Sequence, residues 1–136
     1  MPTDDKFVAA SDTIENSPHS ALTRVIEAGF ELWYQTEDDE LTIRVTLAGN
    51  HIGYANFEGG DRNADIQNIW VEPNSRQSGV GGAICALAVK LLNKPLRNIW
   101  NEEEILQAAR LKGELDAESF CEFWRRLQLS YPELFE

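Results

Sequence analysis

Basic residues are scarce in this chain of 136 residues. Lys and Arg number 12 against 23 Asp and Glu, which gives a formal net charge of −11 and an isoelectric point near 4.6. Such a surface repels nucleic acid backbones and anionic membranes, so we expect no direct binding to either. It would attract a basic partner, although an acidic surface can also serve solubility alone.

Long apolar runs, a secretion signal and a cysteine framework are also lacking. No stretch reaches the ~18 apolar residues that a membrane span needs, and residues 1–6 have neither the basic nor the apolar region of a secretory signal. Cys85 and Cys121 lie in apolar, helix-like stretches and are expected to be reduced core residues. His19 and His51 have no partners at metal-ligand spacing, so no metal site is expected. These absences predict a cytoplasmic protein.

Length and periodicity predict one domain of mixed α and β structure. A chain of 136 residues that is 43% hydrophobic can build one core, preceded here by a polar, loosely ordered arm over residues 1–18. Residues 19–136 then form the single domain. Alternating apolar residues predict strands over 30–34, 41–47, 51–57, 64–71 and 96–100, the second and third as a hairpin. Helical periodicity predicts helices over 20–28, 79–93, 101–112 and 116–130, with Ser20, Asn101 and Asp116 as caps.

The most informative segment joins the 64–71 strand to the helix that follows it. Trp70-Val71-Glu72-Pro73 ends the strand, and Arg76-Gln77-Ser78-Gly79-Val80-Gly81-Gly82 leads into the helix. This order aims backbone N–H groups and a helix N-terminus at an anion, typically a phosphate. Glycine allows a ligand to approach the backbone closely. Close packing of a helix on a sheet is the other interpretation of the same glycines.

The segment resembles the acyl-CoA-binding signature of the GNAT superfamily of N-acyltransferases: Gln or Arg, two residues, Gly, one residue, then Gly or Ala. Arg76 to Gly81 match it at every fixed position, and residues 41–93 follow the family's order of hairpin, strand, loop and helix. The resemblance implies an α/β (α+β) fold, a mixed, mostly antiparallel twisted sheet with flanking helices. The chain would be a divergent or truncated member, because the helices between the family's first two strands are missing or moved upstream to 20–28, and residues 101–136 are atypically helical.

The resemblance also implies an N-acetyltransferase. The co-substrate would be acetyl-CoA, and the acceptor a primary amine on a small molecule or a basic protein. Some family members carry a general base on the fourth strand; Asp65 falls at that place, and Glu72 is a second candidate. Tyr54 on the neighbouring strand could line the acceptor groove, or belong to the core. The implied coenzyme-binding residues are Ile69, Val71, Arg76, Gln77, Ser78, Gly79, Val80, Gly81 and Gly82.

A second hypothesis is a non-catalytic, acidic binding or regulatory protein with a GNAT-like fold. The helix over 101–112 has no Tyr to act as the family's general acid, and the net charge of −11 suits a basic partner. One example would be an inhibitor of mobile-element origin that docks on a nucleic-acid enzyme. The helical stripe of Phe120, Phe123, Trp124 and Leu127 is expected to pack on the sheet, with a homodimer face as the alternative.

Overall fold

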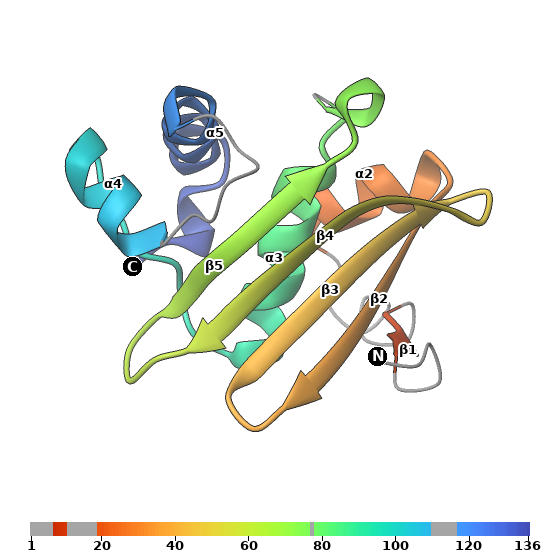
Figure 1. Cartoon of the computed structure of the whole chain (residues 1–136), viewed down its shortest axis with the longest axis horizontal. Helices are drawn as coiled ribbons and strands as arrows, with labels where there is room; N and C mark the ends of the chain where they lie inside the picture. Colours follow the sequence, from red (N-terminus) through yellow and green to blue (C-terminus); the bar gives the residue numbers. More distant parts are fainter. Residues whose placement is uncertain (1–6, 11–18, 77, 110–116) are drawn as a thin grey trace.

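The computed structural model describes residues 7–10, 19–76, 78–109 and 117–136. They form a mixed α+β structure in which one antiparallel sheet has the strand order β1-β2-β3-β4-β5 (Figure 1). The strands are β1 (Val8–Ala9), β2 (Phe30–Glu37), β3 (Glu40–Leu47), β4 (Asn50–Gly59) and β5 (Ala64–Val71). The helices are α2 (Ser20–Glu27), α3 (Val80–Leu92), α4 (Glu102–Ala109) and α5 (Ala117–Ser130), with short 3-10 helices η2 (Pro73–Ser75) and η3 (Pro132–Leu134).

Alternation of apolar and polar residues along the strands decides which face of the sheet the helices cover. Leu41, Ile43 and Val45 of β3 are fully buried, and the residues between them are half-buried. The buried side faces α2 and α3, which lie behind the strands in Figure 1. α3 supplies the matching surface, because Ile84 and Leu87 are also fully buried. The hydrophobic core therefore lies between this one face of the sheet and the helices.

The hairpin between β3 and β4 forms where the alternation predicted it. Its turn, Ala48-Gly49, has positive φ angles of 51° and 82°, and glycine adopts this conformation without strain. The pairing register shifts between Val45 and Thr46, and again on β4 between Asn56 and Phe57. These irregularities bend the strands and increase their twist.

At the N-terminal end, part of the arm predicted over residues 1–18 belongs to the sheet. Val8 and Ala9 pair antiparallel with Tyr34 and Trp33 of β2. Residues 1–6 and 11–18 lie outside the described residues. The next helix begins as predicted, but its cap is His19 rather than Ser20: the His19 Nδ1 accepts from the Ala21 N–H at 3.1 Å. Imidazole thus satisfies an amide that a serine was expected to satisfy.

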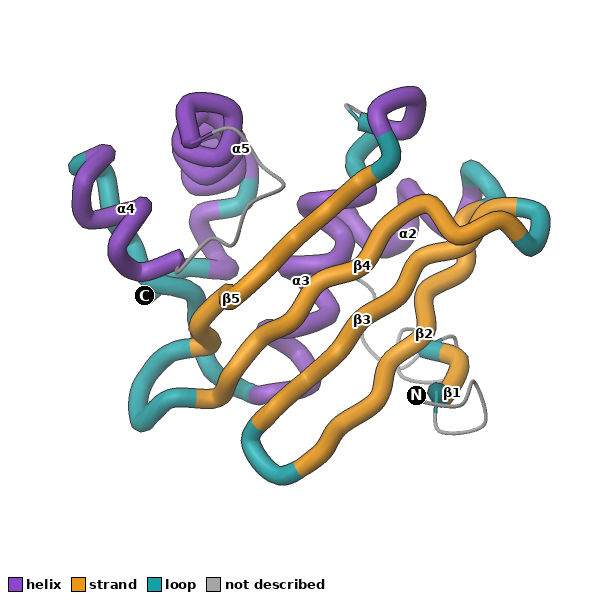
Figure 2. The backbone as a smooth tube through the Cα atoms, in the orientation of Figure 1, coloured by secondary structure: helices purple, strands orange, loops and turns teal. Residues whose placement is uncertain are grey.

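After α3 the structure departs from the prediction. The segment 96–100 is not a strand: Figure 2 draws it as loop, and its one bridge joins Leu96 in parallel to Phe135. The Ala64 N–H donates to the Pro95 carbonyl at 2.9 Å, and the loop then leaves β5 for α4. The two helices expected downstream are present as α4 and α5, α4 capped as predicted by Asn101, while Asp116 lies outside the described residues. A strand was wrongly predicted here because the described residues that follow form helices α4 and α5 and not the strands that would pair with 96–100.

Candidate functional site

The loop between β5 and α3 is held in shape by its own hydrogen bonds. The Arg76 Nε donates to the Val71 carbonyl at 2.8 Å, and the Ser75 N–H donates to the Glu72 carbonyl at 2.8 Å. The Ser78 hydroxyl donates to the Ser75 carbonyl. Gly79 ends the loop in the left-handed region, with a φ of 91°, and is the N-cap of α3. Arg76 therefore fixes the loop to the end of β5; Gln77 lies outside the described residues.

The first turn of α3 contains the backbone amides that were predicted from the sequence to bind an anion. The Ala83 N–H makes the first intrahelical bond, to the Gly79 carbonyl at 3.0 Å, so the amides of Val80, Gly81 and Gly82 precede the helical ladder. The Val80 side chain is buried. These amides have the direction that an anion requires.

Helix α5 and the segment after it pack against the side of this turn. A Cβ on Gly81 would lie 2.8 Å from Phe123 Cε1, closer than any ordinary carbon contact. A Cβ on Gly82 would meet Tyr131 Cε2 at 3.4 Å and Leu127 Cδ1 at 3.5 Å. Both glycines thus allow close approach of α5 to α3. The close packing at these two positions is of helix on helix, not of a helix on the sheet as the alternative interpretation had it.

The outer edge of β5 is the place where a pantetheine arm would be expected. The Glu72 N–H donates to the Ile52 carbonyl at 2.7 Å, so by the alternation of an antiparallel ladder the backbone groups of Ile69 and Val71 point away from β4. The Ile69 side chain is buried on the helix side, and Val71 is half-buried. The Val71 carbonyl already accepts from Arg76.

The two candidate bases lie at opposite ends of β5. Asp65 is near the start of the strand and pairs with Arg97, Oδ1 to Nε at 2.7 Å and Oδ2 to Nη2 at 3.4 Å. Glu72 follows the last residue of the strand, and its Oε2 accepts from the Ser75 hydroxyl at 3.4 Å. Asp65 and Val71 are six positions apart along the strand, about 20 Å at ~3.3 Å per residue. One acceptor amine cannot meet both carboxylates.

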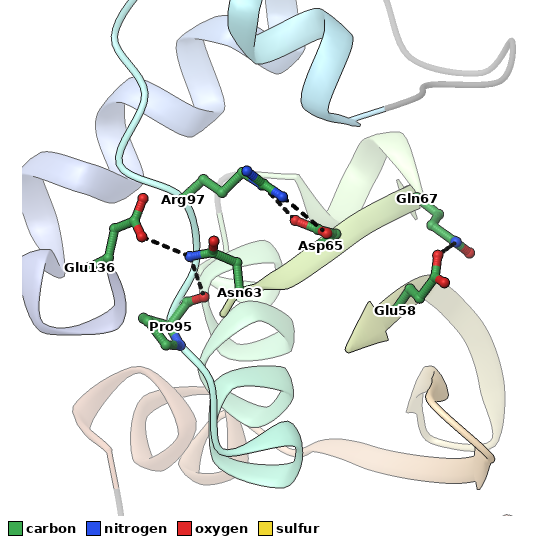
Figure 3. Close-up of polar contacts among 7 residues, drawn as sticks. All are labelled: Glu58, Asn63, Asp65, Gln67, Pro95, Arg97 and Glu136. Atoms are coloured by element: carbon green, nitrogen blue, oxygen red, sulfur yellow. Dashed lines mark hydrogen bonds and ion pairs between the residues drawn. The ribbon is translucent and has the colours of Figure 1, made fainter. Parts of the chain in front are cut away.

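The surroundings of Asp65 form a structural polar cluster (Figure 3). The buried Asn63 donates through Nδ2 to Glu136 Oε2 at 3.0 Å and to the Pro95 carbonyl at 3.4 Å. The ion pair of Asp65 raises the pKa of Arg97, mainly through the hydrogen bond between them. These contacts fasten the 95–97 loop and the last described residues to the start of β5.

A small cavity adjoins this cluster. Its lining includes Ile66 of β5, Ile105 of α4, and Phe120 and Trp124 of α5. Its volume is about 10 Å³, at the lower limit for one water molecule. The cavity therefore has no room for an acyl chain or an amine.

The face of the sheet turned away from the helices holds polar and aromatic residues that the sequence analysis did not single out, apart from Tyr54. Trp70, Tyr54, Arg44 and Trp33 are successive cross-strand partners from β5 to β2. A second row is joined by side-chain bonds: Asn68 Nδ2 donates to Asn56 Oδ1 at 3.3 Å, and Asn56 Nδ2 to Thr42 Oγ1 at 3.0 Å. In β2 and β3 the signal was the alternate set of positions, which is polar or aromatic throughout. In β4 and β5 the register shifts at bulges, so strict alternation does not give the face.

Three rings on that face stand close together. The ring centroids of His51, Tyr54 and Trp70 are each 6.0 Å apart, and the interplanar angles are 16°, 17° and 31°. Partial burial, and then the charge of Arg44, lower the pKa of His51 below its usual value. The Arg44 guanidinium carbon lies 5.0 Å from the centroid of Phe7. We call His51, Tyr54 and Trp70 the aromatic triangle.

Other kinds of site receive no support from the described residues. Among them, no group of three or more His, Cys, Asp and Glu side chains is arranged to hold a metal ion. In the same part of the chain, no helix has both the length and the apolar character needed to cross a membrane. Cys85 and Cys121 are both free and buried, as predicted.

Comparison of the chain with models of known protein families, with curated proteins and with solved structures gives no significant match.

Proposed function

We propose that this chain is an acidic binding protein that docks on a basic surface of another protein, with a GNAT-like fold that does not serve acetyl transfer. The observation that carries this proposal is the packing of Phe123 against Gly81 in the first turn of α3. A diphosphate would have to lie beside these amides. The Phe123 ring takes the space beside Gly81 where a side chain would stand, which favours a packing role for this glycine.

The surroundings of Asp65 support the same proposal. Asp65 is engaged by Arg97 and lies a strand's length from the glycine-rich loop. A general base must come within hydrogen-bond reach of the amine whose proton it takes. The cavity nearest to Asp65 holds at most about one water molecule. The described residues around this carboxylate thus leave little space for an amine or a thioester.

The charge supports a basic partner. A net charge of −11 on 136 residues speeds association with a cationic surface and slows association with an anionic one. The affinity of such a complex falls as salt screens the charges. The partner would be a Lys- and Arg-rich protein, which includes proteins that themselves bind nucleic acid.

An acyl-CoA-dependent N-acetyltransferase is the second candidate, and two observations favour it. The backbone groups of Ile69 and Val71 point to the outer edge of β5, where pantetheine would add as a further strand. Gly79 adopts the left-handed conformation, and the amides after it precede the helical ladder of α3. A coenzyme would bind at these amides. Asp65 or Glu72 would then be the base.

Calorimetric titration of the full chain separates the two candidates. The ligands are acetyl-CoA, free CoA, deca-arginine, deca-lysine and a neutral Gly-Ser decapeptide, each at about 50 mM and about 300 mM salt. Salt-sensitive binding of the cationic peptides, with no heat from CoA at about 1 mM, would support the binding protein. Micromolar CoA binding, about −8 kcal/mol, that is lost in Ser78→Glu would overturn it in favour of the acetyltransferase.

A further inference from the structure

One face of the sheet has no described helix against it. Figure 1 looks onto this face: α2 and α3 lie behind the strands, and α4 and α5 lie beyond the edge of β5. Side chains alternate across a sheet, so the face presents the residues between the buried apolar ones. On β3 these are Glu40, Thr42, Arg44 and Thr46, none of which is buried.

Carboxylates occupy one end of this face. Glu37 of β2 is directly opposite Glu40 of β3, and Glu40 is directly opposite Glu58 of β4. All three side chains are exposed, and no described Lys, Arg or His forms a salt bridge with them. Like charges directly opposite one another destabilise a sheet. We call Glu37, Glu40 and Glu58 the carboxylate row.

The aromatic triangle lies further along the same face. Tyr54 and Trp70 belong to the row that includes Arg44, four residues along β3 from Glu40, which is about 13 Å at ~3.3 Å per residue. Arg44 lies over the ring of Phe7. The exposed Glu31 adds a fourth Glu near this end, and Asp65, the partner of Glu58 on β5, adds a carboxylate that is paired with Arg97. The face therefore holds five carboxylates against Arg44 and Arg97.

We propose that this open face is the docking surface of the protein, and that its occupant is an arginine-bearing extended segment of a basic partner protein. The inference rests on the proposed function and adds the surface and the side chain that it recognises. Guanidinium groups bind carboxylates through two parallel hydrogen bonds, and they stack on aromatic rings better than ammonium groups do. The carboxylate row and the aromatic triangle are about four extended residues apart. A cation at the carboxylate row would also relieve its repulsion.

Two matched pairs of variants test the surface. Glu40→Gln with Glu58→Gln removes two charges from the carboxylate row, and Glu103→Gln with Glu104→Gln removes two exposed charges from α4. Trp70→Leu removes a ring of the aromatic triangle, and Trp100→Leu removes a ring that is 50% exposed outside the sheet. Binding of deca-arginine and deca-lysine to each full-length variant is measured by calorimetry at about 50 mM salt, and folding is followed by thermal melting.

We expect the Glu40/Glu58 variant to bind deca-arginine about tenfold more weakly than wild type and the Glu103/Glu104 variant less than about twofold more weakly. The Glu40/Glu58 variant should melt at or above the wild-type temperature, since like charges are removed. Trp70→Leu should abolish the preference for arginine over lysine, and Trp100→Leu should keep it.

The failures of the two proposals can be told apart. If wild type binds neither peptide, the proposed function fails and the docking surface fails with it. If wild type binds but both double variants weaken binding equally, net charge alone acts and only the docking surface is overturned. Tighter binding of a single-stranded oligothymidine than of deca-arginine, lost in Trp70→Leu, would also overturn it, because the rings would then stack on bases.

Discussion

Substituting alanine for each of two adjacent glycines tests the packing on which the proposed function depends. In Gly81→Ala the new Cβ would lie 2.8 Å from Phe123 Cε1 and 3.2 Å from Cζ, so the ring must move by ~0.7 Å to reach a normal contact. Overpacking of this kind costs about 1–3 kcal/mol. The low end applies, because Phe123 is half-buried and can yield. The higher helix propensity of alanine over glycine offsets up to about 1 kcal/mol of this cost in a helix interior, and less in the first turn.

In Gly82→Ala the new Cβ would make ordinary contacts at 3.4 and 3.5 Å with Tyr131 and Leu127. We therefore expect Gly81→Ala to lose about 1 kcal/mol and Gly82→Ala to be neutral or gain about 0.5 kcal/mol. For a chain of this length that difference is about 5 °C in Tm. Urea and thermal melts measure it, and Phe123→Leu should remove most of the cost of Gly81→Ala in a double-mutant cycle. If Gly81→Ala is as stable as Gly82→Ala, α5 does not cover this turn.

Three further predictions concern other parts of the fold. The pKa of His51 is lowered in the folded state from 6.5, so the contribution of neutral His51 to stability is present above that pH and is lost as the pH falls below it. Tm should therefore drop less between about pH 7 and about pH 5 in His51→Gln than in wild type. An equal drop in the two proteins would refute this. Burial raises the pKa of Cys85 to about 12 and also raises the pKa of Cys121. A thiol reagent at about pH 8 should therefore modify neither cysteine until urea unfolds the chain. Rapid labelling of the native protein would contradict the buried positions. Asn63→Ala should cost about 1 kcal/mol in urea melts, because it removes the Nδ2 hydrogen bonds to Glu136 and to the Pro95 carbonyl. The Pro95 carbonyl keeps the Ala64 N–H as a donor and Glu136 is exposed. An unchanged midpoint would show that the cluster is not formed.

Much of the local structure was readable from the sequence. The period of two in Leu41, Ile43 and Val45 predicted β3, and the Gly49 turn predicted the hairpin. The strand predicted over 64–71 and the helix after the glycine-rich loop are also present, with nearly the expected bounds. Each of these features depends on residues that are neighbours in the chain, so their spacing is enough to predict them.

The spacing of residues along the chain did not decide the function of the glycine run. Gly81 and Gly82 fit an anion site and a packing contact equally well, because both need the absence of a side chain. The structure adds contacts from Phe123 and Leu127 of α5 and from Tyr131, which follows that helix. All three lie more than 40 residues further along the chain, and the anion site stays a prediction. The acetyltransferase prediction and the alternative of an acidic binding protein both remain predictions for the titration to separate.

The sequence by itself determined the net charge, the periodicity of the strands and helices, and roughly where the helices begin. Only the tertiary structure decided that 96–100 would be a loop, that α5 would lie on α3, and that Glu37, Glu40 and Glu58 would stand side by side. Cross-strand neighbours depend on register and on bulges, and a shift of one residue would turn those carboxylates to the other face. Helix contacts likewise depend on which apolar surfaces are left to cover once the sheet has formed, and no local spacing specifies that.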